Sequence, residues 1–224
     1  MGGLELNQLE RLANDNMNTQ LSQEFMEWEV QAALKQMAPL KSLGPDGMPS
    51  LFYQHYWDLV GGDEINSILS FLNTATLPEP LNHAFLTLIP KIKNPISMSD
   101  YRSVSLCNVL YKIFSKVLAN RLKRILTSII IEHQSAFTKN CLILDNILVA
   151  FENLHSMNIH KSSKHGYMAI KFDMSKAYDR VEWFFLEITM RKLGFNERWI
   201  TLMMICVKTV SYSVLVNGEP KEVF

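Results

Sequence analysis

The stretch 108–126, NVLYKIFSKVLANRLKRIL, is the feature that most limits what this chain can fold into. Apolar residues recur along it at helical spacing: Leu110, Ile113, Phe114, Val117, Leu118, Leu122 and Ile125. Lys112, Lys116 and Lys123 fall outside that stripe. The pattern predicts an amphipathic helix that buries one side and carries lysines elsewhere.

The rest of the chain places helices first and isolated strands late. Helical spacing predicts helices over 22–37 with Ser22 as N-cap, 50–60, 63–75, 142–156 and 183–192, and a further helix that ends at 207. The first of these has apolar residues at helical spacing: Phe25, Trp28, Val30, Ala33, Leu34 and Met37. Gly61 and Gly62 are expected to separate the second helix from the third. Short apolar runs bounded by turn residues predict strands over 84–90, 167–173 and 211–218. This order favours an α+β fold over a regularly alternating sheet.

Composition allows a substantial core, because the chain has 224 residues and is 48% hydrophobic. Its formal charge of zero hides an uneven distribution, since residues 1–35 are mostly acidic. Residues 85–124 hold eight Lys and Arg residues against the single acid Asp100. Such a basic block indicates either a polyanionic partner or a solvated helix face.

Cysteine usage and the N-terminal sequence indicate an intracellular protein. Cys107, Cys141 and Cys206 are far apart, so they form neither a zinc-binding spacing nor a disulfide framework. The start, MGGLELNQLE, lacks the apolar core of a signal peptide. No apolar run approaches the roughly 18 residues of a membrane span, so no membrane partner is expected.

Residues 169–181, AIKFDMSKAYDRV, place an acid at the end of an apolar run. Asp173 could cap the helix that follows, or it could hold Mg²⁺, which prefers carboxylate oxygens. Tyr178 could be a core residue or could pack under a nucleotide sugar. Lys91 and Arg102 could be ordinary surface charges or could clamp a triphosphate.

Five segments in order resemble the reverse transcriptase of LINE-type, non-LTR retrotransposons, of the kind abundant in plants. They are SLGPDGMPSLFYQHYW, LTLIPKIKNP, YRSVSLCNVLYKIFSKVLANRL, QSAF and YMAIKFDMSKAYDRVEW. The resemblance runs from about residue 33 to residue 220. It implies an α+β right-hand polymerase fold, with an N-terminal extension and fingers over 1–165 and a partial palm over 166–224. The palm part would hold the first catalytic strand, the helices after it and one further strand.

The resemblance also implies roles for single residues. Asp173 matches the first catalytic aspartate, a ligand of the Mg²⁺ ions of an RNA-directed DNA polymerase, and the backbone carbonyl of Met174 would help to bind the metal. Tyr178 matches the residue that lies against the deoxyribose. Lys91 and Arg102 match residues that grip the incoming dNTP.

The partners that the resemblance implies are an RNA template, a DNA primer and dNTPs, in the nucleus or the cytoplasm. Lys112, Lys116 and Lys123 on the basic helix would lie along the nucleic acid, where lysines neutralise phosphates.

Three departures from the family pattern affect the expected activity. Ser103 stands where the family has proline, and Asn140 and Cys141 stand where it has a Gly-Arg pair. The sequence reaches Phe224 without the motif that supplies the partner carboxylates, so the fold is expected to be incomplete at the C-terminus. The chain alone is therefore expected to be inactive. The alternative is a decayed transposon relic or a non-catalytic nucleic-acid-binding module.

Overall fold

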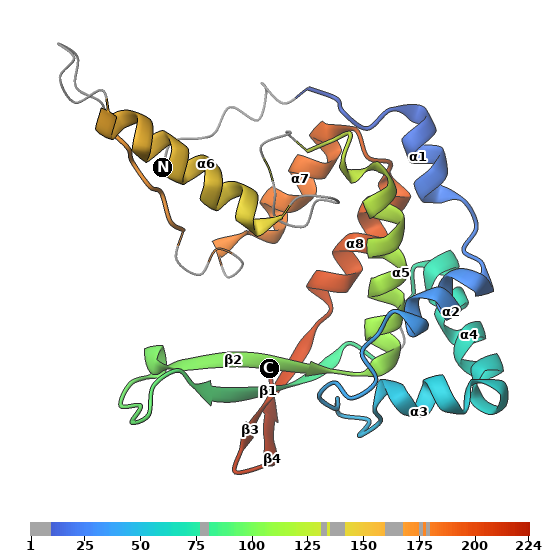
Figure 1. The fold of residues 1–224 in the computed structure, drawn as a ribbon. Helices are drawn as coiled ribbons and strands as arrows, with labels where there is room; N and C mark the ends of the chain where they lie inside the picture. The colour runs from blue at the N-terminus through green and yellow to red at the C-terminus, as the bar shows by residue number, and fades with distance from the viewer. Residues whose placement is uncertain are drawn as a thin grey trace.

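The structure, a computed structural model, describes residues 10–76, 81–130, 134, 142–159, 168–174, 177 and 180–224. Its helices are α1 (Asp15–Ser22), α2 (Glu27–Lys35), α3 (Ser50–His55), α4 (Trp57–Thr74), the short 3-10 helix η2 (Met98–Asp100), α5 (Val109–Leu126), α6 (Ile143–Ile159), α7 (Trp183–Leu193) and α8 (Glu197–Lys208). Its strands are β1 (His83–Pro90), β2 (Tyr101–Cys107), β3 (Ser211–Val216) and β4 (Glu219–Val223) (Figure 1). Helices with one small sheet agree with the predicted α+β class.

The sheet has the strand order β2-β1-β3-β4. β1 and β2 form a long antiparallel pair from Ala84↔Cys107 to Pro90↔Tyr101. β3 runs parallel to β1 over a shorter stretch, which ends at Leu86↔Val214. The far end of the β1–β2 hairpin therefore projects beyond β3, as Figure 1 shows. The strands at 84–90 and 211–218 were predicted, but β2 was not.

Helix α5 lies at the centre of the hydrophobic core and confirms the predicted amphipathic helix. Its inward side chains are Val109, Ile113, Phe114, Val117, Leu118 and Ile125, all buried. They belong to one cluster with buried residues of α2, α4 and α8. The rings of Phe71 on α4 and Phe114 lie 4.5 Å apart. The core thus forms around the helix whose apolar stripe was clearest in the sequence.

One ion pair is buried in this core. Arg121 and Glu29 are only 4% and 5% exposed, and Arg121 donates from Nε to Glu29 Oε1 at 2.8 Å and from Nη2 to Oε2 at 2.6 Å. Arg121 also donates to the backbone carbonyls of Leu21 and Glu24, and its guanidinium lies 3.5 Å from the centre of the Phe25 ring. It therefore ties the α1–α2 connection to α5.

The pKa of Glu29 shows that this pair is charged. Burial acts to raise the pKa of the Glu29 carboxyl. Hydrogen bonds from Arg121 and from the Met26 N–H, together with the positive charge of Arg121, outweigh burial and lower the pKa below its ordinary value. Glu29 is therefore ionised at neutral pH.

The loop between α2 and α3 packs on the junction of β2 and α5. The Asp46 carboxylate accepts a hydrogen bond from the Val109 N–H at 3.3 Å, and the Asp46 N–H donates to Asn108 Oδ1 at 3.1 Å. A Cβ on Gly44 would lie 2.5 Å from the backbone C and O of Cys107. This loop needs glycine at 44, and its aspartate satisfies the first turn of α5.

Two predicted helix boundaries were wrong. Ser22 ends α1 instead of capping the next helix, which begins at Glu27. Gly61 and Gly62 do not break α4, which continues through both. Gly61 is buried, and a Cβ added there would lie 2.8 Å from the Trp57 ring, so the packing at this position suits glycine despite its low helix propensity.

The strand predicted over 167–173 is also wrong for its described part. Residues 168–174 have no strand assignment, and Met168 and Phe172 are 81% and 90% exposed. A strand is held by backbone hydrogen bonds to a neighbour, and no described strand pairs with this segment.

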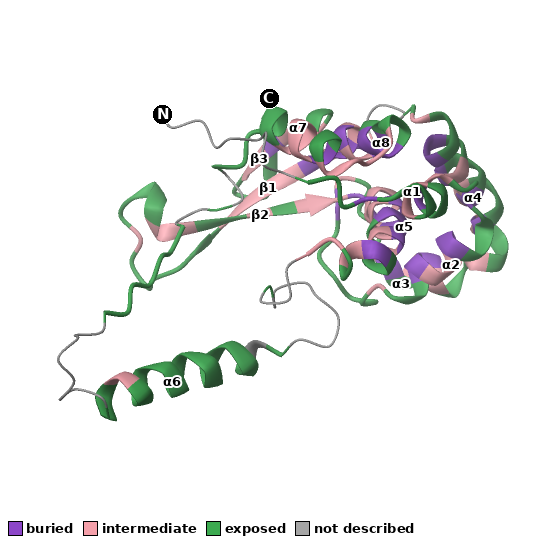
Figure 2. Cartoon of the chain, turned by 90° about the horizontal axis from the view of Figure 1, so that it is seen from above, coloured by how far each residue is buried: buried purple, intermediate pink, exposed green. Residues whose placement is uncertain are grey.

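Helix α6 was predicted over 142–156 and is present, but its described side chains pack little. Figure 2 shows it apart from the other helices and almost wholly exposed. Exposed apolar residues on it include Leu144, Ile147, Leu148, Phe151 and Leu154. In the described part of the chain, no helix has the length and apolar character to cross a membrane.

Candidate nucleic-acid interface

Two of the three α5 lysines predicted to bind nucleic acid lie near the segment between α2 and α3. Lys112 and Lys116 are half-buried, whereas Lys123 is exposed further along the helix. The Lys112 ammonium donates to the Ser42 carbonyl at 3.0 Å. Because Asp46 fixes the same loop to the start of α5, the backbone around Ser42 is held next to these lysines.

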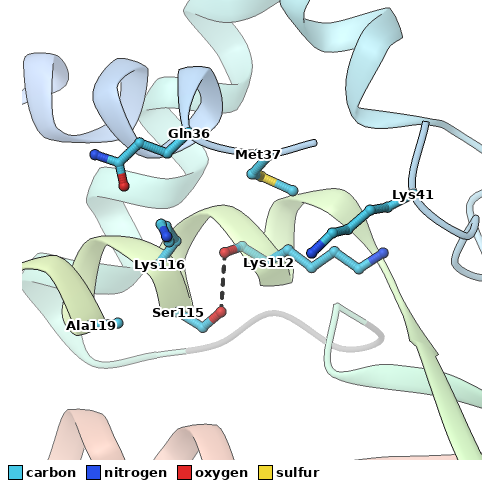
Figure 3. A pocket seen from close by; sticks show the side chains of 7 residues that line it. All are labelled: Gln36, Met37, Lys41, Lys112, Ser115, Lys116 and Ala119. Carbon is cyan, nitrogen blue, oxygen red and sulfur yellow. Dashed lines mark hydrogen bonds between the residues drawn. The ribbon is translucent and has the colours of Figure 1, made fainter. Parts of the chain in front are cut away.

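A hollow of about 360 Å³ opens between α5 and the residues that end α2. Its lining residues are Gln36, Met37, Lys41, Lys112, Ser115, Lys116 and Ala119 (Figure 3). Three lysines but no carboxylate line it, and none of those lysines forms an ion pair with another described residue. The hollow is therefore a concentrated positive site, open to an anion.

A second hollow of about 250 Å³ continues along the same two helices. Trp28, Glu29, Ala32, Gln36, Val117, Asn120 and Arg124 line it, so Gln36 borders both hollows. The only carboxylate here, Glu29, is already paired with Arg121. We call the two hollows together the α2–α5 groove.

Trp28 is the residue of this groove that the sequence placed wrongly. It belongs to the apolar spacing that predicted its helix, yet it is 57% exposed, with the Arg124 guanidinium 5.7 Å from its ring centre. The helix begins at Glu27, and 3.6 residues per turn then place position 28 opposite Val30, which is fully buried. Phe25 lies before the helix begins. The helical positions of Val30 and Leu34, taken without Phe25, would have placed Trp28 on the exposed side.

Lys91 and Arg102 come together at the projecting end of the β1–β2 hairpin. Arg102 pairs with Ile89 in the strand register, and the Lys91 N–H donates to the Asp100 carbonyl at 2.7 Å. The Lys91 ammonium donates to the Ser99 carbonyl, and the side chains of Lys91 and Arg102 are exposed. The two cations thus share one end of the hairpin, as a common ligand would require.

The turn that joins these strands is held by Asp100. Its carboxylate accepts hydrogen bonds from the N–H groups of Ile96 and Ser97 at 3.0 and 2.9 Å. The bonds from Ser97 and Ile96 lower the pKa of the Asp100 carboxyl. Asp100, the acid of this basic region, is therefore hydrogen-bonded to backbone N–H groups.

Asp173 and Met174 lie on the exposed segment 168–174, and the Met174 side chain is 65% exposed. Tyr178 lies outside the described residues, as do Asn140 and Cys141. No hydrogen bond or ion pair between described residues joins Asp173 to Lys91 or Arg102. Within the described ranges, no group of three or more His, Cys, Asp or Glu could hold a metal ion. Asp173 thus offers one carboxylate, and the described residues alone do not make a magnesium site.

The two described cysteines are poor candidates for chemistry. Burial raises the pKa of the Cys206 thiol to about 12 and also raises that of Cys107. Both are therefore thiols at neutral pH and not thiolate nucleophiles or ligands.

Comparison with known proteins agrees with the sequence motifs. Residues 89–223 match the family model described as reverse transcriptase (RNA-dependent DNA polymerase). The chain is also 28% identical over 189 residues to the uncharacterized 149 kDa protein of transposon TX1 from Xenopus laevis. That alignment covers 84% of this chain and 14% of the relative, so the chain spans a small part of its relative's length. These matches confirm the resemblance to a non-LTR retrotransposon reverse transcriptase, whereas the plant-like character stays a prediction. The chain therefore belongs to the reverse transcriptase family.

Proposed function

We propose that this chain forms the fingers and the first part of the palm of an RNA-directed DNA polymerase from a non-LTR retrotransposon. The fingers and N-terminal extension would cover 1–165 and the palm part 166–224. The observation that carries the proposal is the lysine-lined hollow of the α2–α5 groove, within a chain of this family. A polymerase must hold a polyanionic template and primer, and a positive groove without free carboxylates suits that partner.

The end of the β1–β2 hairpin suits a second polyanion. Arg102 presents a planar guanidinium and Lys91 a compact ammonium, both exposed at the same end of two paired strands. Guanidinium and ammonium groups bind phosphate oxygens with charge-assisted hydrogen bonds. In this proposal they grip the triphosphate of the incoming dNTP.

Asp173 and the backbone carbonyl of Met174 would contribute oxygen ligands to Mg²⁺, and Tyr178 would lie against the deoxyribose. Bound metal ions supply the in-line nucleotidyl transfer chemistry of polymerases. Two divalent ions close together need several anionic ligands, and Asp173 is one. The other carboxylates would come from outside the described residues. By resemblance, the family supplies them from a Tyr-Ala-Asp-Asp motif. This sequence does not contain that motif, so the 224 residues alone are proposed to be inactive.

Primer extension on an RNA template with Mg²⁺ and dNTPs tests this function. The chain alone is expected to incorporate no nucleotide. The chain joined to the palm region of a related reverse transcriptase is expected to extend the primer. Asp173→Ala should lower that rate by about a thousandfold, because a metal ligand contributes several kcal/mol to the transition state.

Asp63→Ala is the matched control, since Asp63 is an exposed aspartate on α4. It should leave extension by the joined chain unchanged. Incorporation that survives Asp173→Ala would overturn the role of Asp173, and incorporation by the 224 residues alone would overturn the proposed inactivity.

A second candidate is a non-catalytic nucleic-acid-binding module, as in a decayed transposon sequence. The exposure of the segment that carries Asp173 favours it. RNA binding without nucleotide incorporation by the joined chain would support this candidate over the polymerase.

A further inference from the structure

We infer that the α2–α5 groove binds one single strand of nucleic acid, with phosphates on its lysines and a base stacked on Trp28. The inference rests on the proposed function, because it names the form of nucleic acid that the polymerase would hold at this surface. It also assigns roles to Trp28, Lys41, Asn120 and Arg124, none of which had an individual role from the sequence.

The lysine end of the groove has the chemistry of a phosphate site. Lys112 and Lys116 stand one turn apart on α5, and Lys41 reaches the same hollow from the residues after α2 (Figure 3). The Lys112 ammonium uses one of its three donors on the Ser42 carbonyl, which leaves two for a phosphodiester. Lysine binds phosphate as a point charge and reads no base, so this end would hold any sequence.

The other end has the chemistry of a base platform. The Trp28 ring is 57% exposed at the border of the groove, and Arg124 sits over it at 5.7 Å. Every base has a flat π face, so an exposed indole stacks bases without sequence preference. A guanidinium beside the ring adds a charge for the adjacent phosphate and a planar surface of its own.

The separation of the two ends favours a single strand over a duplex. Lys112 and Arg124 are twelve residues apart on α5, which is about 18 Å at 1.5 Å per residue. A strand lying along this length would present several phosphates to Lys112, Lys116 and Arg124. Bases inside a duplex are stacked on each other and cannot reach Trp28, whereas an unpaired base can turn out onto the ring. Asn120, between the two ends, offers an amide to the sugar or base.

Fluorescence anisotropy with a labelled 12-nucleotide RNA strand over a salt series tests the lysine end. Lys112→Gln with Lys116→Gln should weaken binding and reduce the slope of log affinity against log salt by about 1.4, since each phosphate contact on a single strand contributes about 0.7. Lys41→Gln alone, at an exposed position, should reduce it by about 0.7.

Lys192→Gln with Lys221→Gln is the matched control, because both lysines are exposed and lie on α7 and β4. It should leave the slope unchanged. If the control pair and the groove pair change the slope equally, the assignment of the phosphate contacts to the groove lysines is overturned. Circular dichroism of each variant separates lost binding from lost folding.

Trp28→Ala should weaken binding of the same strand by about fivefold to 150-fold, the range for loss of one base stack. Trp28→Phe should retain most of the affinity, and Trp183→Ala, at another exposed tryptophan, should bind as the wild type does. Unlabelled strand should quench the tryptophan emission of the wild type but not of Trp28→Phe. A 12-base-pair duplex should cause no such quenching.

Equal affinity of Trp28→Ala and wild type, or equal quenching by strand and duplex, would overturn the inference. Single-stranded DNA should bind as RNA does, because phosphates and π faces are common to both. Binding of RNA alone would overturn the assignment of the affinity to phosphates and base stacking. These are equilibrium measurements. If the binding measurements fail, primer extension still tests the polymerase proposal. If primer extension fails, the binding measurements still test the groove.

Discussion

Helix α5 and the segment 168–174 differ in how far their side chains are buried and paired with neighbours. On α5, Phe114 is 1% exposed and Arg121 is 4% exposed, with its charge paired and hydrogen-bonded. On the segment, Phe172 is 90% exposed and the acid beside it, Asp173, is also exposed. The candidate binding surface is thus built by contacts within the described residues, whereas the candidate catalytic acid is not. The proposed binding surface and the proposed catalytic acid can therefore be tested separately.

The same substitution in the two regions gives the largest expected contrast. Phe114→Ala should lower the free energy of unfolding by about 3–5 kcal/mol, because it leaves a cavity among α2, α4 and α5. Phe172→Ala should change it by less than about 0.5 kcal/mol, as an exposed position does. Urea denaturation measures both. A large loss for Phe172→Ala would mean that segment 168–174 packs against the rest of the chain.

Glu29→Gln tests whether the buried pair supports the α5 region through its charge. It should lower the free energy of unfolding at pH 7 by about 3 kcal/mol, because Arg121 keeps a buried charge without a counter-charge. The folded pKa of Glu29 lies below its ordinary value of 4.5, so its ionisation stabilises the fold above pH 4.5. That contribution is lost as the pH falls through the lowered folded pKa.

The difference between wild type and Glu29→Gln should therefore shrink as the pH falls below 4.5, in urea denaturation repeated across acidic buffers. Glu27→Gln is the control, since Glu27 is exposed on the same helix and should cost less than about 0.5 kcal/mol. A constant difference between wild type and Glu29→Gln at every pH would contradict the charged pair.

Gly44→Ala should destabilise the fold by about 1–3 kcal/mol, less than Phe114→Ala, because its Cβ would lie 2.5 Å from the backbone of Cys107. Gly62→Ala is the matched control with the opposite sign. Its Cβ would meet nothing within 4 Å on α4, so alanine should stabilise the helix by about 0.5–1 kcal/mol. Thermal melts of both variants decide, and a neutral Gly44→Ala would show that the loop does not need this close approach.

The elements with a strong, unbroken period were predictable from the sequence, and the others were not. The stripe of α5 runs over eighteen residues, so its phase was clear. The sequence of α1, DNMNTQLS, is mostly polar, and its position depends on Asn18 bonding to Gly194 and Asn196 near the other end of the chain. The strand β2 has exposed Arg102 and Ser103, and only its pairing with β1 makes it a strand.

The residues of the candidate site also differ in whether the sequence alone could identify them. Lys112 and Lys116 could be chosen from the sequence because they fall outside an apolar stripe. Lys123 was chosen on the same ground, but it lines neither hollow of the groove. Lys41 could not be chosen from the sequence, because its place at the groove depends on how the loop with Gly44 and Asp46 packs on the start of α5. Tertiary contacts between distant segments carry no period that a local pattern reveals.

The parallel pairing of β1 with β3 has a consequence for how this protein is made. It joins His83 to Ser211, whose side chains also share a hydrogen bond across 128 positions of sequence. A contact of such long range forms slowly, because the intervening chain must first be synthesised and then lose its freedom. During translation, the contacts among α2, α3, α4 and α5 can form early, while one edge of the β1–β2 hairpin stays unpaired until β3 leaves the ribosome. We expect the nascent chain to depend on chaperones most in that interval.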